Sequence, residues 1–164
     1  MSVGALMRTG VRIGVDVGTV RVGVAATDAT ATLASPVAVV RRDVRGDADL
    51  DRIRTVVVER EAIEVVVGLP RLLRGGEGVA AASARDYAVR LARRVAPVPV
   101  RLVDERLTTV EAARALRDTG KDARRARDIV DAAAAVVLLQ AAVDTERSTG
   151  APPGELLNAE STHE

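Results

Sequence analysis

The chain of 164 residues contains no cysteine, tryptophan or phenylalanine, and it has one tyrosine and one histidine. The missing cysteines exclude disulfides and thiolate metal ligands, and His163 lies in a polar C-terminal segment. Any bound metal would therefore be held by oxygen atoms, which favours Mg²⁺ or Mn²⁺ over zinc. Because Tyr87 falls on the apolar face of an expected helix, stacking of unpaired bases on aromatic side chains is not expected.

Long apolar stretches are also missing. No uncharged run reaches membrane-spanning length, and residues 1–7 are too short and too broken for a signal sequence, so we expect a cytoplasmic protein with no membrane partner. The net charge of +1 does not by itself indicate a nucleic-acid partner. The length suits one domain, which we expect over residues 1–146, with a disordered tail over 147–164 that is rich in proline, glycine, serine and threonine.

Strands and helices are expected to alternate along the chain. Residues 12–17 and 21–27 are joined by so short a connection that they must pair antiparallel, and a third strand is expected over 35–41. Apolar periodicity and capping residues predict the remaining elements: a helix over 48–60, a strand over 63–67, a loop over 68–78, a helix over 79–95, a strand over 100–104, a helix from Thr108 to about 118 and a helix capped by Asp128 that runs to about 144. This order predicts an α/β fold with a ribonuclease-H-like mixed sheet: a three-strand antiparallel meander, then αβαβ and two closing helices.

Acidic residues stand at three places where an apolar element begins or ends. These are Asp16, the pair Asp104 and Glu105, and Asp131. A buried carboxylate is costly unless it finds a hydrogen-bonding partner, a proton or a cation, and several carboxylates at one spot favour the cation. Strand alternation sends Asp104 and Glu105 to opposite faces, and we favour Glu105 as the one that reaches the site. The predicted catalytic and metal-binding residues are Asp16, Glu105 and Asp131, with Asp104 and Asp128 as alternative ligands.

Each of these acids also has a purely structural explanation. Asp16 can bond the backbone amides of its own turn, and Asp131 can complete a capping box with Asp128, which would stabilise the helix by about 1 kcal/mol. Against the capping explanation, the segment that follows Asp131 is apolar on every side, so the start of its helix can point into the domain.

A basic segment precedes the last predicted helix. Residues 114–127 hold six basic groups against two acids, a local balance of +4. A solvated helix end is the usual meaning of such a segment, but next to the proposed metals we prefer contact with a phosphate backbone. The predicted substrate-binding residues are Arg21, Arg71, Arg74, Lys121, Arg124, Arg125 and Arg127.

Four motifs occur in a characteristic order: Asp16-Val-Gly-Thr-Val-Arg-Val-Gly-Val-Ala25, Val67-Gly-Leu-Pro70, Asp104-Glu-Arg-Leu-Thr-Thr109 and Val130-Asp-Ala-Ala-Ala134. Together they resemble the YqgF family, also called RuvX, over about residues 11–145. The resemblance implies a ribonuclease-H-like fold and hydrolysis of phosphodiester bonds with a divalent metal. It places Asp16, one acid of the Asp104–Glu105 pair and Asp131 on the family's acidic positions. Arg71 and Arg74 depart from the smaller, polar loop that the family commonly has there.

From these features we expect a metal-dependent nuclease that acts in 5′-end maturation of pre-16S ribosomal RNA. Its partner would be structured RNA or branched DNA, and the protein would be a monomer or a weak homodimer. Two alternatives within nucleic-acid biology stay open: a Holliday-junction resolvase, and a nucleic-acid-binding module without catalysis. Asp16-Val-Gly-Thr19 also resembles the phosphate loop of actin-like and sugar-kinase ATPases, but those proteins need a second lobe with another such loop, which the chain lacks.

Overall fold

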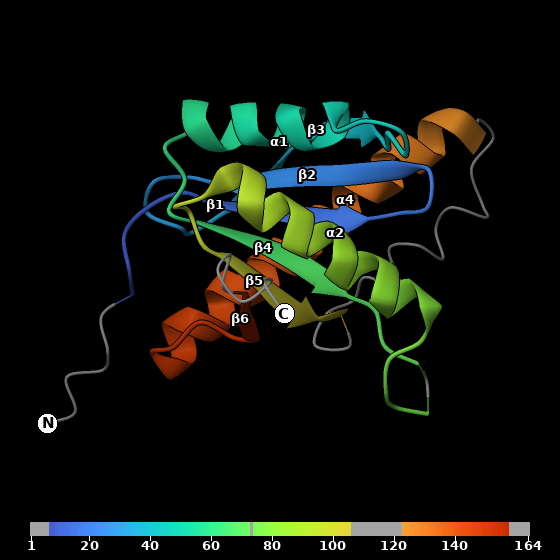
Figure 1. Ribbon diagram of the computed structural model, residues 1–164. Coiled ribbons are helices and arrows are strands. Elements are labelled where there is room, and N and C mark those ends of the chain that lie inside the picture. The colour runs from blue at the N-terminus through green and yellow to red at the C-terminus, as the bar shows by residue number, and fades with distance from the viewer. Residues whose placement is uncertain (1–6, 73, 106–122, 158–164) are drawn as a thin grey trace, which may run out of the picture.

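A computed structural model describes residues 7–72, 74–105 and 123–157, except for the side chains of 123–131 (Figure 1). Six strands form one mixed sheet in the order β3-β2-β1-β4-β5-β6. The strands are β1 (Arg12–Val17), β2 (Arg21–Thr27), β3 (Ala34–Arg41), β4 (Glu64–Leu69), β5 (Val100–Asp104) and β6 (Glu155–Leu157). The described helices are α1 (Ala48–Glu59), α2 (Val79–Val95) and α4 (Ala123–Thr149). None of these helices is long and apolar enough to cross a membrane.

The strand directions confirm the predicted meander and crossovers. β2 pairs antiparallel with both β1 and β3. β4 pairs parallel with β1, and β5 pairs parallel with β4. The turn between β1 and β2 closes with a hydrogen bond from Gly18 N to Arg21 O of 2.9 Å. A Cβ atom on Gly18 would lie 2.5 Å from that oxygen, so only glycine fits there.

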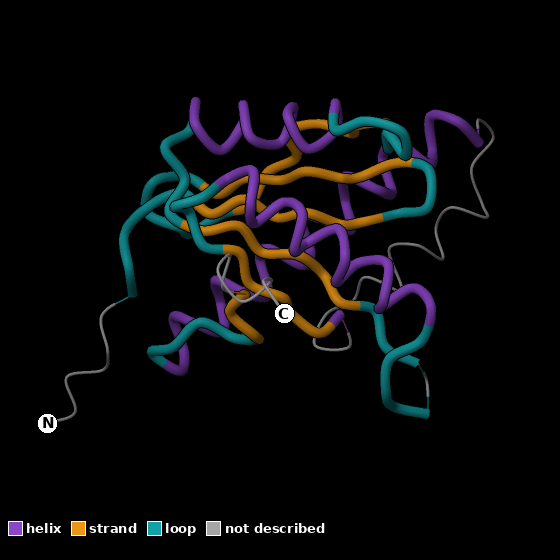
Figure 2. The backbone as a smooth tube through the Cα atoms, viewed as in Figure 1, coloured by secondary structure: helices purple, strands orange, loops and turns teal. Residues whose placement is uncertain are grey.

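Two apolar layers pack on opposite faces of the sheet. Every second residue of β1, such as Ile13 and Val15, packs against α1 and α2, while α4 covers the other face (Figures 1 and 2). On that second face Gly14 lets the helix come close, because a Cβ atom there would lie 2.7 Å from Cβ of Leu139. Strand alternation places Asp16, two residues after Gly14, on the face that α4 covers.

Ion pairs, one of them fully buried, hold the C-terminal half of α4 to the amino ends of β1 and β4. Arg12 Nη2 donates to Glu146 Oε2 at 2.9 Å, and Arg8 Nε donates to Glu146 Oε1 at 2.6 Å. Arg8 also bonds Glu64, whose carboxylate lies 3.4 Å from Nε of Arg101. Burial opposes the charge of Glu146, but hydrogen bonds and attraction from Arg8 and Arg12 outweigh it and hold the pKa of that carboxyl below its ordinary value.

Several boundaries differ from the sequence-based prediction. β4 includes Gly68 and Leu69, which were expected in the following loop. α4 already includes Ala123, so Asp128 is not its N-cap, and Asp131 is not in its first turn. Alanine and arginine are strong helix formers, and they extend the helix backward past the capping residue that sequence favoured. The helix predicted from Thr108 to about 118 lies outside the described residues.

The segment expected to form a tail begins with regular structure. α4 continues to Thr149, and β6 pairs antiparallel with β5 through Leu157, Leu156 and Glu155. Gly154 permits this approach, because its φ is +90° and a Cβ atom there would lie 2.0 Å from Leu102 O. Composition could not reveal this strand, since its partner lies far away in the sequence. Residues 158–164 are outside the described part of the chain.

Candidate active site

Asp16 lies near the carboxyl end of β1 and is buried, with 3% of its surface exposed. It pairs across the hairpin with Gly23. On its other side, Val15 pairs with Val67 of β4, so the next position of that strand, Gly68, neighbours Asp16. A buried carboxylate in the central strand is thus bordered by glycine on both neighbouring strands.

Glu105 follows the last residue of β5 and is also buried, with 6% exposed. A Cβ atom on Gly68 would lie 2.8 Å from Oε1 of Glu105 and 3.1 Å from Cδ2 of Leu138 in α4. The carboxylate of Glu105 therefore lies across β4, over the space that a side chain at Gly68 would fill. Asp16 and Glu105 approach that glycine from two different strands and on the same face of the sheet.

Asp104 takes the opposite face. Its neighbour on the strand, Val103, packs with α4, and strand alternation turns Asp104 toward the other layer. There Nε of Arg71 lies 3.8 Å from Oδ2 of Asp104, and Nη1 of Arg71 lies 3.6 Å from a carboxylate oxygen of Glu77. Asp104 is consequently an anchor for the loop after β4, separated by the sheet from Asp16.

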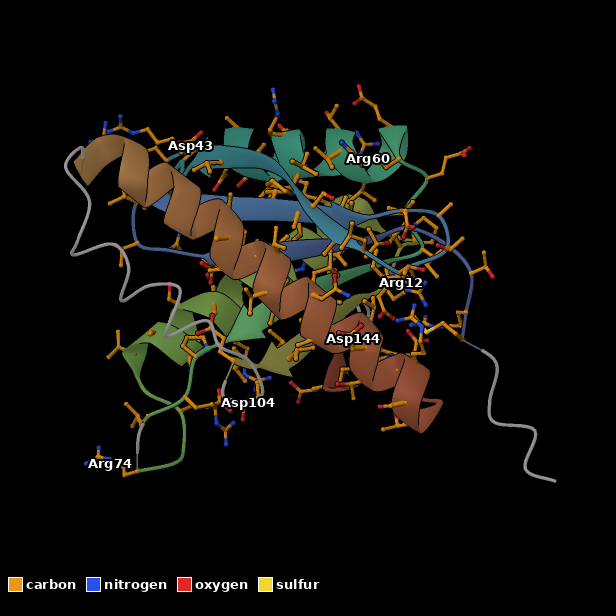
Figure 3. The ribbon with its side chains drawn as sticks, turned by 180° about the vertical axis from the view of Figure 1, so that it is seen from behind. Arg12, Asp43, Arg60, Arg74, Asp104 and Asp144 are labelled. Carbon is orange, nitrogen blue, oxygen red and sulfur yellow. The ribbon has the colours of Figure 1, made fainter. Side chains whose placement is uncertain are left out.

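The described arginines that were expected to bind substrate lie in three different places relative to Asp16. Arg21 begins β2 on the same face as Gly23 and Asp16. Arg71 is held between Asp104 and Glu77, whereas Arg74 is exposed and projects away from the body of the protein at a loop tip (Figure 3). The structure therefore brings Arg21 near Asp16, and it does not bring Arg71 there.

The remaining predicted site residues fall outside what the structure describes. Lys121 lies in the segment 106–122. The backbone of α4 carries the other five, whose side chains are not described: Arg124, Arg125, Arg127, Asp128 and Asp131. Among the described residues no three carboxylate or histidine groups gather closely enough to hold a metal ion.

Arg42 supports the turn beside Asp16, and no sequence pattern indicated it. Its guanidinium donates to Gly18 O at 3.2 Å and to Ser83 Oγ at 3.1 Å, and it lies 5.3 Å from the centre of the Tyr87 ring. The Tyr87 hydroxyl in turn donates to buried Asp49 at 3.0 Å. Burial and this carboxylate raise the pKa of the Tyr87 phenol above its ordinary value. Arg42 thus connects α2 to the turn that follows Asp16.

A family model described as "RuvX: Holliday junction resolvase" matches residues 10–145. The chain belongs to the RuvX family. A protein of Nocardioides sp. named "Putative pre-16S rRNA nuclease" is 56% identical over 156 residues, covering 92% of this chain and 98% of its own length. A protein of the same name from Thermobifida fusca is 56% identical over 159 residues, which cover 92% of this chain and 98% of that protein.

Solved structures agree with the RuvX fold. RuvC of T. thermophilus, in a structure described as a complex with a Holliday junction substrate, superposes with a TM-score of 0.53 at 18% identity. The superposition covers 90% of this chain and 99% of RuvC. At this identity the likeness establishes the ribonuclease-H-like fold predicted from the element order.

Proposed function

We propose that the protein is a metal-dependent nuclease that hydrolyses phosphodiester bonds in precursor 16S ribosomal RNA, with Asp16, Glu105 and Asp131 as its catalytic carboxylates. The observation that carries the proposal is the meeting of Asp16 and Glu105 around Gly68. The close relatives named for pre-16S ribosomal RNA support the choice of substrate. Ribosomal RNA is processed where ribosomes assemble, so the proposal includes a cytoplasmic location.

The direction of α4 supports Asp131 as the third acid. Residues Ala135 and Leu139 lie beside Gly14, and Glu146 reaches Arg12, so the helix runs from the carboxyl end of β1 toward its amino end. Asp131 is one turn before Ala135, about 6 Å along the axis, and Asp16 is about 7 Å along its strand from Gly14. The displacement from Ala135 to Asp131 and the displacement from Gly14 to Asp16 both lead to the carboxyl end of β1. Helical spacing also puts position 131 on the stripe of buried residues Ala134, Ala135 and Leu138.

The donor set suits a hard divalent cation. Both described acids supply only carboxylate oxygens, and the absence of cysteine leaves no thiolate ligand in the chain. When bound, Mg²⁺ or Mn²⁺ would supply the activation of water and the charge stabilisation that phosphodiester hydrolysis requires. Asp16, as the central acid, would hold the metal from β1, and Glu105 and Asp131 would hold it from a strand end and a helix.

The remaining residues shape the space for substrate. Glycine at position 23 adds no side chain beside Asp16, so that a sugar-phosphate backbone can approach β2, and glycine at position 68 leaves the space that the carboxylate of Glu105 takes. Arg42 fixes the turn after Asp16 from the opposite face. Together they would keep the central carboxylate oriented toward the scissile phosphate.

Cleavage assays with matched acid variants test this proposal. The protein is incubated with precursor 16S RNA, single-stranded RNA and four-way DNA junctions, with Mg²⁺, with Mn²⁺ and with a chelator. We expect metal-dependent cleavage of the precursor RNA that Glu105→Gln abolishes and Asp104→Asn retains. Calorimetric titration with Mn²⁺ supplies a second readout, in which Glu105→Gln weakens binding and Asp104→Asn does not. Equal loss in both variants would contradict the assignment of Glu105.

A second candidate, a Holliday-junction resolvase, is favoured by the likeness to RuvC and by the description of the matching family model. The same panel separates the two candidates. Symmetric cleavage of four-way junctions, at a rate above that for precursor RNA, would favour the resolvase.

A further inference from the structure

Two arginines face each other across β2 and β3. Arg21 pairs directly with Arg41, and the next pair, Val22 with Val40, packs into the apolar layer beneath α1 and α2. Since successive residues alternate between faces, both arginines belong to the opposite face, the one that carries Asp16. We call Arg21 and Arg41 the arginine pair.

The arginine pair lies in line with the proposed active site. Arg21 is two residues from Gly23, about 7 Å along the strand, and Gly23 is the partner of Asp16. Arg41 lies one strand farther toward the edge of the sheet. Across this face the order is therefore Arg41, Arg21, Asp16, Gly68 and Glu105.

Arg41 stands directly opposite another cation, which is an unfavourable arrangement in a sheet, so the counter-charge available to Arg41 is the question. Arg41 is exposed and forms no ion pair with any residue that the structure describes. The two acids of the following loop are otherwise engaged. Asp43 accepts the amides of Arg45, Gly46 and Ala48, and Asp47 bonds Arg90 and Arg94. The charge of Arg41 is thus not neutralised by its own loop.

We propose that the arginine pair binds the phosphodiester backbone of the substrate strand and directs it across β2 and β3 toward Asp16. This inference rests on the proposed nuclease function and adds Arg41 to the residues that contact substrate. A phosphate beside Arg41 would supply the counter-charge that its own loop does not provide. The contact would position the strand without reading its bases.

The test measures binding in the full-length Asp16→Asn protein, so that cleavage does not interfere. A fluorescein-labelled single-stranded RNA is titrated at several salt concentrations, and Arg41→Gln is compared with Arg60→Gln. Both substitutions remove one exposed arginine, but Arg60 lies at the opposite end of α1 from the loop that holds Asp43 (Figure 3). Arg41→Lys serves as the variant that retains the charge.

Arg41→Gln should weaken binding and flatten the log–log salt dependence by about 0.7, as expected for one phosphate contact on a single strand. Arg60→Gln and Arg41→Lys should keep the parental slope. The melting temperature of Arg41→Gln should be equal to or above that of the parent, which a structural role would not produce. If Arg41→Gln keeps the parental slope, or if Arg60→Gln weakens binding equally, this inference is wrong, while the proposed nuclease function is unaffected. If the Asp16→Asn parent binds neither RNA nor a four-way junction, the proposed function fails as well.

Discussion

Glu64 and Asp16 are equally buried acids on the same face of the same sheet, each with 3% of its surface exposed, yet their neighbours differ completely. Glu64 pairs with Arg12 on β1 and lies within ion-pair distance of Arg101 on β5. Asp16 has Gly23 on one neighbouring strand and Gly68 on the other. The first acid has long cationic side chains as neighbours, and the second has glycine beside it on each neighbouring strand.

The difference shows how one fold can give two buried carboxylates opposite surroundings. Arginine side chains fill the volume around Glu64 and compensate its charge, so that end of the sheet is stabilised by its own residues. The glycines beside Asp16 bring no cationic side chain to it, and the side chain that reaches over Gly68 is a second carboxylate, that of Glu105. Burial alone does not distinguish the two acids, whereas the size and charge of their neighbours do.

The sharpest way to test this contrast is to neutralise each acid in turn. Asp16→Asn should reduce metal-dependent cleavage by on the order of a thousandfold or more, as removal of a catalytic group does, with little loss of stability. Glu64→Gln should lower the melting temperature and leave turnover per folded molecule nearly unchanged. Cleavage rates and thermal unfolding of both purified proteins decide the matter. Full activity in folded Asp16→Asn would remove this residue from the site.

The next largest effect, a loss of stability, is expected at the end of the sheet where arginines pair with the buried glutamates. Glu146→Gln leaves the buried charge of Arg12 without its carboxylate and should cost roughly 3 kcal/mol of unfolding free energy, at the low end for a broken buried pair. Denaturant titration measures this loss. Cleavage by the folded fraction should be unaffected, and a specific loss of turnover would contradict a purely structural role.

The acid sensitivity of the same residue provides a second measurement. The folded-state pKa of Glu146 is depressed, so its contribution to stability is present above the unfolded value of 4.5 and is lost as the pH falls through the folded value. Glu146→Gln should therefore flatten the decline of stability below about pH 4.5. If stability declines with falling pH as steeply in Glu146→Gln as in the parent, other carboxylates cause that decline.

Gly68→Ala tests whether the missing side chain at position 68 is what lets Glu105 approach Asp16. The added methyl group would lie 2.8 Å from Oε1 of Glu105, so the carboxylate must move. We expect a loss of cleavage of about thirtyfold, or 2 kcal/mol in activation free energy, and an overpacking cost of about 1 kcal/mol in stability. Kinetics and unfolding are measured on the same preparation.

A double variant gives the control for Gly68→Ala. Glu105→Asp shortens the side chain and relieves the collision, so the combined variant should lose less activity than the product of the two single losses. Strict additivity would show that position 68 and Glu105 do not interact.

The smallest effect is expected for Arg42. Arg42→Met keeps the apolar stem but removes the bonds to Gly18 and Ser83, so kcat should fall several-fold, on the order of 1 kcal/mol. KM should change little, because Arg42 supports the turn after Asp16 from the other face. Arg42→Lys should be intermediate. A change confined to KM would instead indicate direct contact with substrate.

Local patterns were sufficient to predict much of this arrangement. The apolar run around Asp16 predicted its strand, and alternation at the end of β5 separated Glu105 from Asp104, because the period of a strand is a local property. The roles of Gly68 and Arg42 could not be predicted in this way. Gly68 matters through a side chain that reaches it from another strand, and Arg42 matters through a turn and a helix remote in sequence. The position of the side chain of Asp131 stays a prediction.

The ion pairs at the end of α4 have a practical consequence for anyone who shortens the protein. The family match covers residues 10–145, but Arg8 and Glu146, which meet at 2.6 Å, lie just outside both limits. A fragment cut to the matched region would keep Arg12 in the interior without the carboxylate of Glu146, and would leave Glu64 with Arg101 but without Arg8. Fusion tags, crystallisation variants and chimaeras within the family should therefore retain residues 8–146 as a minimum, even though the family match alone would suggest narrower limits.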